Sequence, residues 1–69
     1  MKGMQDAARL THALARLRME YQNLDLTIEK LMNRSRYDEL QLNRLKKRRQ
    51  LLKDTMARIE SQLILDLDA

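Results

Sequence analysis

Apolar residues recur along two stretches of the chain at alternating spacings of four and three. The first set is Leu10, Leu14, Leu17, Tyr21, Leu24, Ile28 and Leu31, and the second is Leu42, Leu45, Arg49, Leu52, Met56, Ile59 and Leu63. This alternation is the heptad pattern of a helix that packs one stripe of side chains, here called its seam, against another helix. The pattern therefore predicts two helices, each with an apolar seam.

The apolar pattern is interrupted between the two sets, where Ser35 and Asp38 occupy the seam positions. Asn33 is suited to end the first helix, and Ser35 followed three residues later by Asp38 indicates the N-cap of the second. Asp6 is suited to cap the start of the first helix. These signals predict a single helical unit over residues 1–69, with helices over about 6–33 and 38–65 and a turn over about 34–37.

Two architectures are compatible with this pattern. One is an antiparallel two-helix hairpin with a coiled-coil-like seam. The other is one long continuous coiled-coil helix, because the heptad phase runs unbroken from Leu14 to Leu63. In a parallel, in-register pair of long helices each Arg49 would face the same residue of its neighbour, and so would each Asp38, which is costly in a dry seam. We therefore expect an all-α fold with the hairpin architecture.

Arg49 is the charged residue of the second seam. In a hairpin it falls opposite Tyr21 or one layer away, and the ring face of that tyrosine can accept a guanidinium. Glu20 and Asp25 flank the ring and can neutralise Arg49 or a neighbouring cation. We predict that Arg49 is structural and sets the register of the hairpin. The residues expected to hold the seam are Tyr21, Leu24, Leu45, Arg49 and Leu52.

Some apolar residues lie off both seams. Met19 and Leu26 are one heptad apart on the outer face of the first helix, and Leu40, Leu51 and Leu65 lie off the seam of the second. A chain of 69 residues buries only a small core. A second apolar stripe on such a chain indicates self-association or a partner helix. We expect a homodimer or a higher bundle.

The composition argues against several kinds of chemistry. The chain has no Cys, Pro, Phe or Trp and only one Gly, and it contains no Gly-rich phosphate loop or nucleophile elbow. His12 has no second His with which to share a metal, and we expect Asp25 and Glu29 to be solvated or paired. We predict no catalytic residue, no cofactor and no metal, so the chain is not expected to be an enzyme.

No apolar stretch approaches the roughly 20 residues that a membrane span needs. Met1, Lys2 and Gly3 lead into no apolar signal-peptide core. We expect a cytoplasmic protein with no membrane contact.

Positive charge is concentrated in the middle of the chain. Residues 30–53 hold nine basic and two acidic residues, whereas the whole chain has a formal net charge of +4. We expect no aromatic side chain to accompany these cations, so any nucleic-acid binding would be independent of sequence. The candidate partner-binding residues are Arg34, Arg36, Arg44, Lys46, Lys47 and Arg48, together with apolar Met19, Leu26 and Leu51.

Two segments, "YQNLDLTIEKL" and "LNRLKKRRQLLKDTMARIESQLI", resemble the small YdcH-like bacterial proteins. The resemblance runs from about Leu10 to Leu67. Its most specific parts are Leu24, Asp25 and Ile28, then Leu45, Lys46, Lys47, Leu52, Lys53 and Asp54. Departures from the family pattern include Tyr21 in place of a frequent His and Leu65 in place of a Pro. The resemblance implies a short helical protein with no assigned enzymatic activity.

These observations predict a small, non-enzymatic interaction module that binds a second copy of itself or another protein. The alternative is an accessory protein that contacts RNA, DNA or the ribosome through residues 34–53 without sequence preference. The ending "LILDLDA" fits a frayed helix end, or else a short peptide that docks in a groove.

Overall fold

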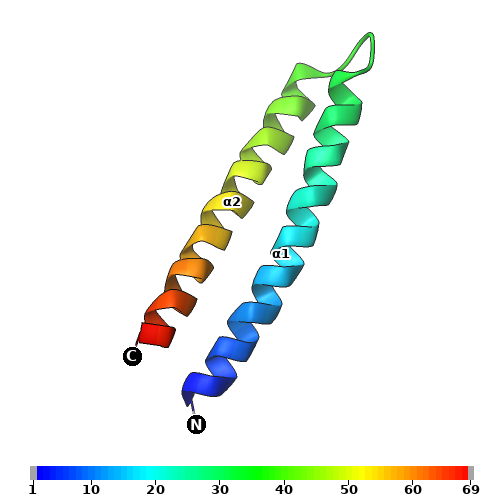
Figure 1. The fold of residues 1–69 in the computed structure, drawn as a ribbon. Coiled ribbons are helices and arrows are strands. Elements are labelled where there is room, and N and C mark those ends of the chain that lie inside the picture. The colour runs from blue at the N-terminus through cyan, green and yellow to red at the C-terminus, as the bar shows by residue number, and fades with distance from the viewer. Residues whose placement is uncertain (1, 69) are drawn as a thin grey trace.

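The computed structural model describes residues 2–68 as two α-helices, with side chains described for residues 6–65. Helix α1 spans Lys2–Met32 and helix α2 spans Glu39–Asp68. The helices lie side by side and antiparallel, with both chain ends at the same end of the molecule (Figure 1). No strand occurs in these residues. The predicted all-α hairpin is confirmed, and the alternative of one continuous helix is wrong because the chain reverses between the helices.

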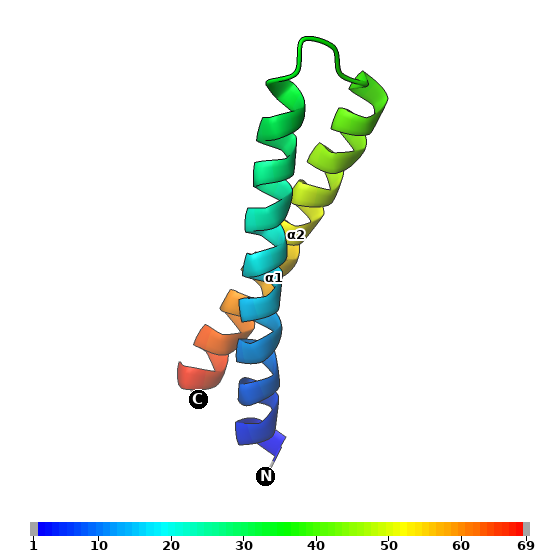
Figure 2. The same cartoon turned by 90° about the vertical axis from the view of Figure 1, so that its right-hand side faces the viewer.

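The hairpin is a rod. Its Cα atoms extend over 53 × 14 × 14 Å, and their radius of gyration is 15.8 Å. A compact domain of this length has a radius of gyration of about 11 Å. The helices cross at a shallow angle, and α2 passes behind α1 when the molecule is turned (Figure 2). Each helix therefore has a single neighbour along one stripe, as in a two-stranded coiled coil.

Both helices extend beyond their predicted outer ends. Helix α1 begins at Lys2, so Asp6 lies within the helix and does not cap it. Helix α2 continues to Asp68 instead of ending near residue 65. No Pro interrupts either end, and most residues there tolerate or favour the helix. The prediction of a cap at Asp6 was therefore wrong.

Helix α1 ends at Met32, next to the Asn33 that the sequence indicated. The Asn33 amide donates a hydrogen bond to the Glu29 carbonyl at 3.1 Å, and the Arg34 amide donates to the Leu31 carbonyl at 3.2 Å. The second bond spans three residues, so the last turn tightens toward 3₁₀ geometry. No described residue has a positive φ, and the helix ends without a left-handed cap.

Asp38 is the N-cap of α2. Its Oδ1 accepts a hydrogen bond from the Leu40 amide at 2.9 Å, and its carbonyl accepts one from the Leu42 amide at 3.0 Å. Ser35, which the sequence pattern indicated as the cap, lies in the connector between the helices. Asp caps helices as well as Ser does and here immediately precedes the first helical residue. The Ser35 prediction was therefore wrong.

The core consists of residues from the two predicted seams. A cluster of Ile28, Leu31 and Leu42 lies near the turn, with Leu24 and Leu45 packed against it. Leu14 and Leu52 are the other buried apolar residues. No polar side chain is buried in the described part of the chain. The hairpin is thus held mainly by one apolar cluster in the half nearer the turn.

Candidate interaction surfaces

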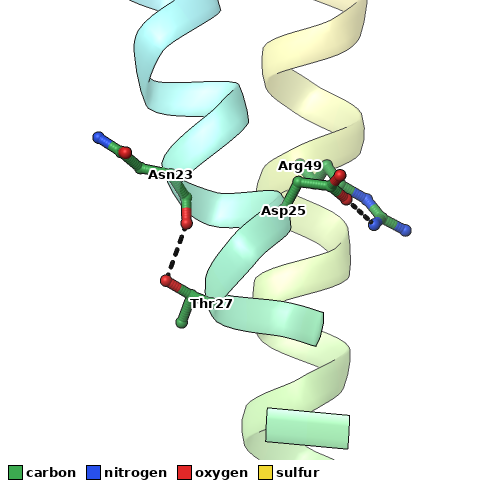
Figure 3. A network of polar contacts seen from close by, with 4 residues as sticks. All are labelled: Asn23, Asp25, Thr27 and Arg49. Carbon is green, nitrogen blue, oxygen red and sulfur yellow. Dashed lines mark hydrogen bonds and ion pairs between the residues drawn. The ribbon is translucent and has the colours of Figure 1, made fainter. Parts of the chain in front are cut away.

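Arg49 and Asp25 form an ion pair across the helix interface. The Arg49 Nη1 atom donates a hydrogen bond of 2.7 Å to Asp25 Oδ1. Figure 3 shows the two side chains meeting at one edge of the hairpin, on the opposite side of α1 from Asn23 and Thr27. The expectation that Asp25 neutralises Arg49 is confirmed. The stacking of the guanidinium on Tyr21 stays a prediction.

The Arg49 side chain leaves the seam and reaches its edge. It is 32% exposed and the Asp25 side chain is 55% exposed. A long side chain can bury its methylene groups against apolar neighbours while its charged end stays in water. This arrangement avoids the large desolvation cost of a fully buried ion pair. Because solvent screens the pair, we assign it a contribution of at most about 1 kcal/mol.

A second ion pair joins the helices farther from the turn. Arg18 Nη2 donates to Glu60 Oε1 at 3.2 Å, and both side chains are exposed. This pair was not predicted from the sequence. The sequence contained a signal for it, since Arg18 directly follows the seam residue Leu17 on α1 and Glu60 directly follows the seam residue Ile59 on α2. Which flanking charges meet depends on the register of the helices. The two ion pairs are consistent with one antiparallel register along the rod.

Three threonine hydroxyls bond within their own helix. Thr11, Thr27 and Thr55 each donate to the carbonyl oxygen four residues earlier, at 2.8 to 2.9 Å. Figure 3 shows the Thr27 bond to the Asn23 carbonyl. Such bonds satisfy the hydroxyl locally and do not connect the two helices.

The fold gathers the basic residues in one half of the rod. The turn half, residues 25–50, contains eight Lys and Arg and four Asp and Glu, whereas the remaining residues contain six of each kind. The whole formal net charge of +4 therefore lies in the turn half. Seven of its eight cations are exposed, namely Lys30 and the six candidate partner-binding residues Arg34, Arg36, Arg44, Lys46, Lys47 and Arg48.

Three of these cations line a shallow hollow on α2. The hollow has a volume of about 510 Å³ and is lined by Leu40, Asn43, Arg44, Lys46, Lys47 and Gln50. All of these residues belong to one helix, so the hollow is a depression in its surface and not an enclosed pocket. It is suited to a charged surface of a larger partner more than to a small molecule.

An exposed aromatic residue accompanies the basic residues. Tyr37 is 41% exposed and lies in the connector, next to Arg36 in the sequence. The expectation that no aromatic side chain accompanies these cations was wrong. Tyr37 lies outside both seams, so the heptad pattern carries no signal for it.

The apolar residues predicted to lie outside the seams are exposed. Met19, Leu26 and Leu51 are more than half exposed, and so are Leu40 and Leu65. Large apolar residues that are exposed number eight in the described part of the chain, whereas five apolar residues are buried. The position of these side chains agrees with the sequence analysis, and their binding role stays a prediction.

Three further features bear on the predictions made from the sequence. Among residues with described side chains, no group of three His, Cys, Asp or Glu residues is arranged to hold a metal ion.

In the ending "LILDLDA", residues 63–65 lie on α2, and the side chains of residues 66–69 lie outside the described residues. Over the described residues, neither helix has a stretch apolar and long enough to cross a membrane.

Comparison with known proteins gives one match. A family model described as "Protein of unknown function (DUF465)" matches residues 14–60. This range includes the connector, the core cluster and both ion pairs. No curated protein and no solved structure matches the chain.

Proposed function

The chain belongs to DUF465, a family of unknown function, and on this premise we propose that it is a small, non-enzymatic helical interaction module that assembles with itself. The resemblance to the YdcH-like proteins is confirmed by the family match. It brings no catalytic residue to carry over. The function is therefore inferred from the surface of the hairpin.

One observation carries this proposal: large apolar side chains are exposed more often than apolar side chains are buried. Scattered exposed leucines are normal on a protein surface. In the part of the chain whose side chains are described, eight large apolar residues are exposed and only five apolar residues are buried. Contiguous apolar surface marks sites of association. A second copy offers a complementary apolar surface without requiring another partner.

Association also supports the stability of the fold. A core of this size rarely supplies more than about 3 to 5 kcal/mol. Burial of additional apolar area contributes roughly 25 cal/mol per Å². An assembly that covers part of Met19, Leu26 or Leu51 would therefore add to a marginal hairpin stability.

Sedimentation equilibrium tests self-association. We expect the 8.3 kDa chain to sediment with at least twice its monomer mass at tens of micromolar. The association should persist or strengthen in sulfate-containing buffer, because such salts favour apolar burial. A folded monomer at every concentration would contradict the proposal.

A second candidate function rests on the charge distribution. The turn half carries the whole net charge. Its seven exposed cations, and the exposed Tyr37 next to Arg36 in the sequence, support contact with RNA, DNA or the ribosome without sequence preference. Binding of this kind weakens steeply between about 50 and 200 mM salt. Affinity capture with and without nuclease separates the candidates, because nuclease would remove only partners held through nucleic acid.

A further inference from the structure

One stripe of α1, from Ala8 to Leu26, is exposed and carries no charged residue, and the next position at the same spacing is Glu29. This stripe lies on the side away from α2, because each of its members is two residues from a seam residue, about 200° around the helix. We call it the back face. Its six positions have spacings of four and three, and all six are exposed. The absence of charge is unusual in a chain in which 35% of the residues are charged. The back face consists of Ala8, His12, Ala15, Met19, Gln22 and Leu26.

We propose that the back face of α1 is the contact surface of an antiparallel homodimer, in which it packs against the back face of a second copy. The register is the one in which Lys2 of one copy lies level with Met32 of the other. This inference rests on the proposed self-association and specifies its surface, orientation and register.

Side-chain size supports this register. Ala8 then faces Leu26 of the second copy, and Ala15 faces Met19 of the second copy. Each apolar layer pairs a large side chain with a small one, which lets neighbouring helices pack closely without overlap. The remaining layer pairs His12 with Gln22, so that polar groups meet polar groups. A two-fold axis repeats every pairing.

Charge supports the antiparallel orientation. The turn half of each hairpin carries the net charge of +4. In the antiparallel dimer each turn half lies beside the electrically balanced half of the second copy. A parallel dimer would place the two positive halves side by side, which is unfavourable.

The outer stripe of α2 is a poorer surface for a second copy. Its spacing is also four and three, from Leu40 to Leu65, but four of its eight positions are charged. The four charged positions are Arg44, Lys47, Asp54 and Arg58. An antiparallel pairing that matches Leu40 with Leu65 would place Lys47 opposite Arg58 of the second copy.

Cysteine cross-linking tests the orientation and register. The chain has no Cys, so two single variants can be mixed: His12→Cys carrying a mass tag, and Gln22→Cys without it. Under oxidation we expect the mixed disulfide to dominate. Two copies of residue 12 would lie about 15 Å apart along the axis, beyond the reach of a disulfide. Ser61→Cys on α2 is the control and should cross-link poorly.

Disulfides formed mainly between two copies of His12→Cys would overturn the antiparallel orientation. Efficient cross-linking through Ser61→Cys, with no mixed disulfide on α1, would overturn the choice of surface.

A matched pair of substitutions tests the surface without cross-linking. Met19 and Leu51 are 65% and 66% exposed in the hairpin, and Glu is tolerated well in helices. Met19→Glu should raise the dimer dissociation constant at least about tenfold, because each dimer loses two apolar contacts and gains two unpaired carboxylates. Leu51→Glu should leave the dissociation constant within about twofold of the wild-type value. Circular dichroism verifies that both variants remain helical.

The reverse result, with Leu51→Glu dissociating the dimer and Met19→Glu leaving it intact, would overturn this inference and retain the proposed function. A wild-type chain that is monomeric throughout would overturn the proposed function itself.

Discussion

The guanidinium of Arg49 lies 2.7 Å from the carboxylate of Asp25 and joins α2 to α1 at the edge of the seam. The backbone of Arg49 thus lies at a seam position, whereas its charged group lies at the edge of the seam. A polar residue at a seam position can specify register at a cost in stability. The pairing with a single carboxylate suits this role, because a shift of one heptad would separate the two groups by about 10 Å.

Replacement of Arg49 by Leu should keep or raise the melting temperature and broaden the distribution of assembly states. The lost ion pair is solvent-exposed and contributes at most about 1 kcal/mol, whereas Leu adds apolar burial. Thermal melts and native mass distributions measure the two effects. Unfolding of Arg49→Leu with a single assembly state would contradict the register role.

Arg49→Glu should lower the melting temperature. The new carboxylate would lie beside Asp25, so the substitution replaces attraction by repulsion at one edge of the seam. We expect a loss of about 1 to 2 kcal/mol, reduced by high salt because the groups are partly exposed. A double variant with Asp25→Lys restores opposite charges and should recover part of the loss.

Asp38→Ala should destabilise the hairpin by about 1 kcal/mol, because it removes the side-chain acceptor that caps α2. For a domain of this size that corresponds to a fall in melting temperature of roughly 4–8 °C. Ser35→Ala is the matched control, since Ser35 lies in the connector. Equal effects of the two substitutions would mean that Asp38 does not act as the cap.

Ile28→Ala should abolish most of the cooperative unfolding transition. Ile28 is 2% exposed at the centre of the core cluster, and truncation of a buried Ile costs about 2–5 kcal/mol. That range is comparable to the whole stability expected of such a core. Leu51→Ala, at an exposed position, should change stability by less than about 0.5 kcal/mol. Chemical denaturation followed by circular dichroism compares them.

If the turn half binds nucleic acid, Arg44→Gln with Lys47→Gln should weaken binding to all sequences alike. The slope of log affinity against log salt should fall by about two, since each phosphate contact contributes close to one unit. Arg49→Leu should change binding little, because its guanidinium is engaged with Asp25. A salt-titrated fluorescence assay distinguishes these outcomes, and a large effect of Arg49→Leu would contradict the structural assignment.

The capping residue of α2 was not predicted correctly from the sequence. Ser35 and Asp38 are both good capping residues, and the sequence alone does not rank them. Which of the two residues caps α2 follows from the packing of Leu42 against Ile28 and Leu31, because that packing determines where α2 can begin. Asp38 immediately precedes that point and therefore caps the helix.

The heptad spacing by itself determined the two helices, their seams and the buried residues, because apolar side chains at that period form one stripe that only a neighbouring helix can cover. Leu14, Ile28, Leu31, Leu42 and Leu52 all lie on the predicted seams. Only the tertiary structure decided which charged residues pair. Asp25 with Arg49 was one of several possible pairs, and Arg18 with Glu60 was not foreseen. Flanking charges such as Arg18 and Asp25 recur at heptad spacing, but which opposite charge each one meets depends on a register that the connector and the core packing set together.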